Sequence, residues 1–158
     1  MNFIQLIQPS ITLRPLTREN WEECAALSVK PKQRHLIAPN VHSIAEAQFL
    51  PGFSSLAIYR GDTMIGYTLF GPDPDDHGMY WIHRLMIDAR YQQAGAGFQA
   101  VLRVIEEIGE RPDRSELVRL GYHPANEAAR KLYAKVGFAE EGVAPWGEMI
   151  AAYAYSQR

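Results

Sequence analysis

The order of hydrophobic and polar positions predicts strands and helices that interleave along the whole chain. Strand-like alternation, or short apolar runs between turn residues, occupies seven segments: 11–16, 54–59, 64–70, 79–87, 116–122, a short piece from 138, and 147–155. Helical periodicity occupies four segments: 18–28, 43–49, about 96–110 and 126–136. Since the pattern shows neither repeats nor low-complexity segments, it predicts one domain, residues 1–158, of the α/β (α+β) class.

Two helix starts are predicted from capping signals. Thr17 is placed to cap the helix over 18–28, which Pro31 is expected to end. Ser43 and Glu46 form an S-x-x-E capping box for the helix that runs to Phe49.

Segment 92–98 is a glycine-containing turn between a predicted strand and a predicted helix. Its sequence lacks the third glycine of G-x-G-x-x-G, and Phe98 stands where a Walker A loop needs Gly-Lys-Ser/Thr. It fits Q/R-x-x-G-x-G/A from Gln92 to Gly97. Glycines permit close approach to the main chain, and N–H groups at a helix N-terminus attract anions, so the turn suits a pyrophosphate. The alternative is a plain glycine-containing helix start.

A second motif, N-x-x-A-x-x-L-Y-x-x-x-G-F, runs from Asn126 to Phe138. Asn126 is a suitable N-cap, and Gly137 is placed to end the helix in a left-handed conformation before the next strand. The two motifs, in this order and at this separation, resemble the signature of the GNAT superfamily of acyl-CoA-dependent N-acyltransferases. The resemblance covers roughly Ile11 to Tyr153.

The resemblance implies a fold and a cofactor site. The expected fold is a mixed, strongly twisted sheet of about six or seven strands flanked by about four helices, whose splayed central strand pair forms the coenzyme A cleft. Acetyl-CoA is the expected co-substrate, and no metal is expected. Cofactor contacts are expected from the following residues: Leu85, Met86, Ile87, Gln92, Gln93, Ala94, Gly95, Ala96, Gly97, Phe98, Asn126, Ala129, Tyr133 and Lys135.

Catalysis of amine acetylation needs a base and an acid. An alkylammonium has a pKa of about 10.4, so a base must remove its proton, and a phenol can protonate the leaving thiolate. Tyr133 matches the superfamily's tyrosine acid, with a packing role as the alternative. His83 and Glu46 are the candidate bases, ahead of Glu148, and water is a further alternative.

Two segments resemble the bacterial diamine and spermine/spermidine acetyltransferases within the superfamily: Ala38 to Ala47 (A-P-N-V-x-S-x-A-x-A) and Arg84 to Asp88 (R-L-M-I-D). A polyamine is therefore the expected acceptor. The alternatives are another amine (a protein N-terminus, an amino acid or a drug) or a non-catalytic acetyl-CoA-binding module. Acceptor contacts are expected from six residues: Asn40, His42, Glu46, Trp81, His83 and Glu148.

Composition narrows the class of partner. With a net charge of −2 and no block of like charge, nucleic acid is not an expected partner. No apolar run approaches the roughly 20 residues that span a bilayer, and no signal peptide is recognisable, so no membrane is expected. One cysteine provides no disulfide, which favours a cytoplasmic location. A homodimer is compatible with the superfamily.

Overall fold

Residues 9–157 of the chain are described by a computed structural model, in which seven strands form one mixed sheet. The strand order is β1-β2-β3-β4-β5-β7-β6. The strands are β1 (Ile11–Pro15), β2 (Ser54–Arg60), β3 (Thr63–Asp73), β4 (Met79–Ile87), β5 (Leu117–Tyr122), β6 (Ala139–Val143) and β7 (Met149–Ala154). The expectation about a signal peptide falls mainly on residues 1–8, which lie outside the described residues.

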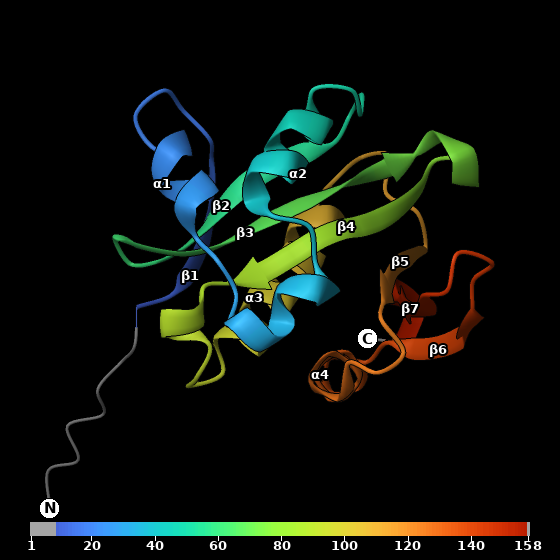
Figure 1. Ribbon diagram of the computed structural model, residues 1–158. Coiled ribbons are helices and arrows are strands. Elements are labelled where there is room, and N and C mark those ends of the chain that lie inside the picture. Colours follow the sequence, from blue (N-terminus) through green and yellow to red (C-terminus); the bar gives the residue numbers. More distant parts are fainter. Residues whose placement is uncertain (1–8, 158) are drawn as a thin grey trace, which may run out of the picture.

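Four α-helices flank the sheet on both faces (Figure 1). They are α1 (Trp21–Ala26), α2 (Asn40–Ala47), α3 (Ala96–Gly109) and α4 (Glu127–Val136), with short 3-10 helices η1 (Pro31–Leu36), η2 (Pro74–Asp76), η3 (Ala89–Tyr91) and η4 (Tyr155–Gln157). The predicted fold class, strand number and helix number are confirmed. No helix within residues 9–157 has the length and apolar character needed to cross a membrane.

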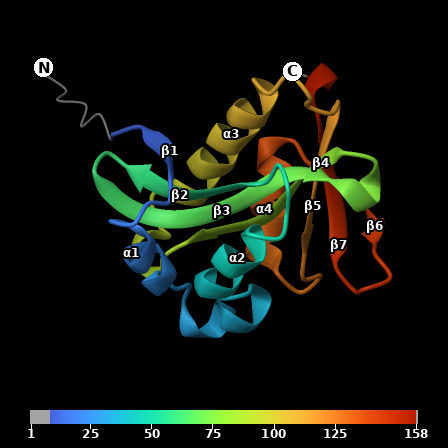
Figure 2. The same ribbon diagram turned by 90° about the horizontal axis from the view of Figure 1, so that it is seen from above.

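The two faces of the sheet carry separate hydrophobic clusters. On one face, Met86 of β4 packs with Cys24 of α1 and with Leu27, which follows that helix. On the other, Ile82 and Ile87 of β4 pack against α3, and α4 adds to this face. Figure 2 shows the long strands β3 and β4 between α3 on one side and α1 with α2 on the other. Strand β4 is therefore buried on both faces along part of its length.

Strands β4 and β5 are parallel and separate after three residue pairs. Pairing runs from Tyr80–Val118 to Ile82–Leu120, and from His83 onward β4 has no strand on its β5 side. All other neighbouring pairs are antiparallel. The ribbons of β4 and β5 diverge in Figure 1. The predicted splayed central pair is thus confirmed, and it leaves main-chain groups of β4 open to a ligand.

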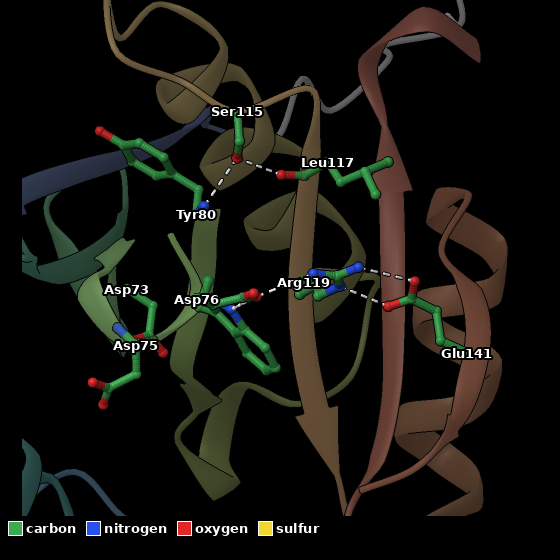
Figure 3. A network of polar contacts seen from close by, with 9 residues as sticks. Asp73, Asp75, Asp76, Tyr80, Ser115, Leu117, Arg119 and Glu141 are labelled. Carbon is green, nitrogen blue, oxygen red and sulfur yellow. Dashed lines mark hydrogen bonds and ion pairs between the residues drawn. The ribbon is translucent and has the colours of Figure 1, made fainter. Parts of the chain in front are cut away.

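Two side chains tie β4 to β5 at the closed end of this splay, Ser115 and Arg119 (Figure 3). The Ser115 hydroxyl accepts a hydrogen bond from the Tyr80 N–H at 2.9 Å and donates one to the Leu117 carbonyl. Arg119 of β5 pairs at 3.0 Å with Asp76, which precedes β4. These contacts hold one end of the strand pair together, so the separation is confined to the other end.

The predicted start of the first helix, at residue 18, is wrong. The α-helix covers only Trp21–Ala26, because residues 17–20 form a turn in which the Asn20 side chain accepts the Thr17 N–H at 2.7 Å. After it the chain is extended at Leu27, and Pro31 begins a 3-10 helix.

The prediction that Ser43 and Glu46 form the capping box of the second helix is also wrong. Helix α2 begins three residues earlier, with the Pro39 carbonyl accepting the N–H groups of His42 and Ser43 at 3.0 and 3.3 Å. Ser43 is therefore a buried residue inside the helix, and Glu46 is free to point elsewhere.

Candidate active site

A cleft of about 820 Å³ opens where β4 and β5 separate. Of the predicted site residues, the following line it: His83, Leu85, Met86, Ile87, Gln92, Gly95, Gly97, Phe98, Asn126, Ala129, Tyr133, Lys135 and Glu148. The 3-10 helix η1 forms part of another wall through Gln33, His35 and Leu36. The cleft therefore joins both sequence motifs to a segment that precedes them by more than 50 positions.

The glycine turn ends in a helix start with unpaired N–H groups. Ala94 and Gly95 are both in the left-handed region, with φ of 65° and 74°. The first bond of α3 runs from the Gln99 N–H to the Gly95 carbonyl at 3.0 Å, and no side chain caps the helix. The N–H groups of residues 96–98 thus face outward without an intrahelical partner, which makes a site for an anion at the positive end of the helix.

Gly97 brings α3 close to α4. A Cβ at this position would lie 3.3 Å from a methyl carbon of Leu132, so the two helices pack with little space between them. Leu132 belongs to the second motif and precedes Tyr133. The two motifs recognised in the sequence are therefore in contact, and the turn is positioned directly against the helix that carries the phenol.

Tyr133 lies on the cleft lining within an aromatic cluster. Its ring stacks on the Tyr122 ring, with centroids 5.8 Å apart. It also packs edge-to-face with the Phe138 ring, with centroids 5.6 Å apart. Burial, with a smaller contribution from Tyr122, raises the pKa of Tyr133 to about 12. The phenol consequently keeps its proton at neutral pH and can donate it.

Asn126 and Lys135, at the two ends of α4, each have a partner: Asn126 caps α4 itself, and Lys135 contacts α3. The Asn126 side chain accepts the Ala129 N–H at 3.1 Å, which confirms the predicted N-cap. Gly137 ends the helix at φ 119°, also as predicted. The Lys135 ammonium lies 4.4 Å from the centre of the Phe98 ring, beside the helix start that faces the cleft.

A β-bulge in β4 directs two neighbouring side chains toward α2. The pairing with β3 shifts between Leu69–Arg84 and Phe70–Ile82, so His83 is the extra residue. His83 and Arg84 both reach Glu46: its Oε1 lies 3.2 Å from the His83 Nε2 and 3.4 Å from an Arg84 guanidinium nitrogen. In a regular strand these two residues would face opposite sides of the sheet.

The environment of His83 favours the neutral imidazole. Burial lowers the pKa of His83, Arg84 lowers it further, and the Glu46 carboxylate only partly opposes them. The His83 Nε2 is buried and makes no hydrogen bond of acceptable geometry within the described residues, despite its nearness to Glu46. A neutral imidazole of this kind can accept a proton.

Glu148 is the third predicted acidic residue of the site, and it also lies on the lining. Its carboxylate accepts a hydrogen bond from the Trp146 indole at 2.7 Å. A Cβ on Gly121 of β5 would lie 3.2 Å from the carboxyl group, so glycine leaves the space that Glu148 occupies. Within residues 9–157 no cationic side chain forms an ion pair with it.

A sequence model of the acetyltransferase (GNAT) family matches residues 13–138, which is most of the chain. The chain belongs to the GNAT family. It is an acetyl-CoA-dependent N-acetyltransferase, with coenzyme A as the carrier of the acetyl group. The two motifs, the splayed strands and the open helix start of α3 are all features of this GNAT domain.

Three individual relatives share no more than a quarter of their aligned residues with this chain. The chain is 25% identical to a spermine/spermidine N(1)-acetyltransferase of Bacillus subtilis, over 84% of this chain and 90% of that protein. An aminoglycoside acetyltransferase solved with coenzyme A superposes with a TM-score of 0.76 at 18% identity, covering 93% and 96% of the two chains. The PaiA N-acetyltransferase of Thermoplasma acidophilum, also with coenzyme A, gives 0.68 at 20%, covering 92% and 99%. These two superpositions establish the shared fold.

Several residues predicted for the site of this GNAT chain lie outside the cleft lining. Asn40 is buried, and its amide donates to the Cys24 carbonyl at 2.9 Å; His42 is exposed on α2. The Trp81 indole donates to Asp76 at 2.9 Å. Glu46 reaches the site only through His83 and Arg84, and Gln93, Ala94 and Ala96 of the turn are likewise absent from the lining.

Other lining residues were missed, among them Gln33, His35, Arg84 and Tyr122. Arg84 was quoted only as part of a resemblance, because a bulge cannot be recognised in the sequence. Gln33 and His35 lie on a 3-10 helix for which no periodicity was recognised. Within residues 9–157, no group of three or more metal-binding side chains comes together.

Proposed function

We propose that the chain transfers the acetyl group of acetyl-CoA to a primary amine of a small polyamine, such as spermidine, spermine or a diamine, by direct attack in a ternary complex. The observation that carries the proposal is the position of Tyr133 and His83. Both lie on the lining of one cleft that also contains the open helix start of α3. An acid, a base and an anion site are thereby available to one pair of substrates.

Main-chain groups would make most of the contacts to the cofactor. The N–H groups at the start of α3 would hold the diphosphate, and Lys135 beside them would add positive charge. Leu85, Met86 and Ile87 lie where β4 has no partner on its β5 side, so their main-chain groups can pair with the pantetheine arm as a strand would. Asn126 lies on the same lining and would contact that arm.

The chemical step needs three proton transfers. His83, with Glu46 beside it, would accept the proton of the attacking ammonium, and the neutral nitrogen would then form a bond to the thioester carbonyl carbon. A main-chain N–H of β4 would stabilise the oxyanion. As the carbon–sulfur bond breaks, Tyr133 would give its proton to the thiolate, and the nitrogen, positively charged after its attack, would return a proton to the tyrosinate and become the neutral amide. At a pKa of about 12 the phenol remains protonated until this transfer.

Direct attack is favoured by the position of the cysteine. Cys24 is fully buried in the cluster below α1, and burial raises the pKa of its thiol to about 12. It is not among the residues of the cleft lining. A thiol that is neutral and enclosed does not serve as an intermediate acetyl carrier.

The carboxylates of Glu46 and Glu148 support the proposal that the acceptor is a cation. The charge of Glu46 is shared with Arg84, whereas within residues 9–157 the Glu148 carboxylate receives only the indole N–H of Trp146. Glu148 is thus available to an ammonium group of the acceptor. The relationship to the B. subtilis spermine/spermidine N(1)-acetyltransferase supports a polyamine in particular.

An amine panel tests this function. The release of thiol from acetyl-CoA would be followed with spermidine, spermine, putrescine, an N-terminal peptide, free amino acids and kanamycin. We expect turnover that depends on the polyamines and exceeds that with every other amine. Turnover with only peptides, amino acids or kanamycin would show that the acceptor is not a polyamine. Tight coenzyme A binding without any turnover would indicate a binding module.

A further inference from the structure

A side-chain bridge connects η1 to the glycine turn. The Gln92 amide nitrogen donates two hydrogen bonds, one to the Ile87 carbonyl at the end of β4 at 2.9 Å and one to the Gln33 Oε1 at 2.8 Å. Gln33 also accepts the Lys30 N–H at 3.1 Å. Since Gln92 begins the Q/R-x-x-G-x-G/A motif, a residue 59 positions earlier in the chain is bonded to the first residue of the cofactor turn.

The main chain fixes the orientation of both amides. The Ile87 carbonyl can only accept, so the nitrogen of Gln92 must face it. The Lys30 N–H can only donate, so the oxygen of Gln33 must face it. With these ends determined, the bond between the two side chains can form in only one sense, with Gln92 as donor. The Gln92 side chain is thereby held between Ile87 and Gln33 on the cleft lining, where it shapes the turn.

The segment that carries Gln33 is attached to the same region at a second place. The Ser28 N–H donates to the Asp88 carboxylate at 3.0 Å, and the Ser28 carbonyl accepts the Ala89 N–H at 2.9 Å. Asp88 is almost fully buried. Residues 28–36 therefore lie across the end of β4 as a strap, anchored at Ser28 and reaching the turn through the Gln33 side chain.

We propose that Gln33 is a positioning residue for coenzyme binding: by holding the Gln92 amide against the Ile87 carbonyl, it keeps the N–H groups at the start of α3 in the arrangement that receives the diphosphate. The inference rests on the proposed role of that helix start in binding the cofactor. It adds that the cofactor turn, although recognisable by its own motif, depends on a side chain from the strap. Gln33 acts only through Gln92.

A double-mutant cycle on coenzyme A affinity tests this role. The dissociation constant would be measured by calorimetry, without any amine, for the wild type, Gln33→Leu, Gln92→Leu and the double variant. We expect each single variant to weaken binding by about three- to tenfold, the equivalent of one lost hydrogen bond. Because Gln33 acts through Gln92, the double variant should bind no more weakly than Gln92→Leu alone. The KM of the amine should stay unchanged in Gln33→Leu.

Two further variants complete the design. Lys32→Leu, on an exposed position of the same 3-10 helix, is the matched control and should bind coenzyme A as the wild type does. Gln33→Asn withdraws the acceptor oxygen by one methylene and provides the same test if the leucine variant does not fold. Wild-type affinity in Gln33→Leu, or additive losses in the cycle, would overturn the proposal. A wild-type chain that does not bind coenzyme A would overturn the proposed function as well.

Discussion

The cleft has two halves that are constructed differently. The half proposed for the cofactor consists of the end of β4, the turn at 92–98 and α4, and it offers mainly main-chain groups and glycines. The half proposed for the acceptor consists of α2, the bulge at His83 and the turn before β7, and it offers side chains: Glu46, His83, Arg84 and Glu148. One half is thus contained mainly in two continuous motifs, whereas the other is assembled from three separate segments.

This difference has a functional meaning within the family. A diphosphate and a pantetheine arm are the same for every acceptor, so contacts by the main chain suffice for them. The acceptor varies between relatives such as the polyamine and aminoglycoside enzymes. Variation requires side chains that can be exchanged without disturbing the turn. Substitutions in the two halves should therefore separate cofactor affinity from acceptor chemistry.

Tyr133 stands between the halves, and its loss should have the largest effect. Tyr133→Phe removes the proton donor but keeps the ring stacked on Tyr122, so we expect turnover to fall about 100-fold, and at least tenfold, with coenzyme A affinity nearly unchanged. Steady-state kinetics and calorimetry would measure the two quantities. Tyr153→Phe, which removes a phenol from the same aromatic cluster behind Phe138, is the control. An unchanged rate in Tyr133→Phe would eliminate the proposed acid.

His83 tests the acceptor half. We expect His83→Gln to lower kcat about tenfold at pH 7.5 without changing coenzyme A affinity. Because burial and Arg84 lower the pKa of His83 below its usual value of about 6.5, the imidazole is neutral and able to accept a proton at neutral pH. The wild-type kcat should therefore fall only as the pH drops below about 6.5, and this acid limb should be absent in His83→Gln. A limb that persists in the variant would assign the base to another group.

The same division decides what could be predicted from the sequence. The proposed cofactor half was predicted because Gly95, Gly97, Asn126 and Gly137 satisfy local backbone requirements, which are visible as residue types at fixed spacing. The splayed strand pair followed from the family resemblance. Local chemistry and the family pattern were enough to predict the fold and to propose this half of the cleft.

The acceptor half could not be read in that way. A regular strand would direct His83 and Arg84 to opposite faces, and only the bulge in the pairing with β3 brings both to Glu46. The position of Glu46 in turn depends on where α2 begins, and the capping-box prediction placed that start three residues too late. Asn40 was predicted from the resemblance of its segment to polyamine acetyltransferases, whereas the fold uses its side chain inside the core.

Gly95 offers the corresponding test of the cofactor half. Gly95→Ala introduces a Cβ at φ 74°, where an L-residue costs about 1 kcal/mol, so we expect about fivefold weaker coenzyme A binding and an unchanged amine KM. Gly78→Ala is a closely matched control: its φ is 78°, and a Cβ there would also meet nothing within 4 Å. Calorimetry on both variants separates strain in the turn from a general loss of stability. Equal losses of affinity in the two would contradict the special role of the turn.

Glu46 should have the smallest effect, and its sign separates a partner of the base from the base itself. The carboxylate raises the pKa of His83, so Glu46→Gln should lower that pKa further and move the acid limb of kcat to lower pH. The contact is half-exposed, so we expect only about a threefold change in amine KM and little loss of kcat at pH 7.5. Glu107→Gln, which removes an α3 carboxylate paired with Arg103 and Arg111, should leave the pH profile of kcat in place. If kcat instead fell more than tenfold and the acid limb disappeared in Glu46→Gln, then Glu46 would be the proton acceptor and His83 its support.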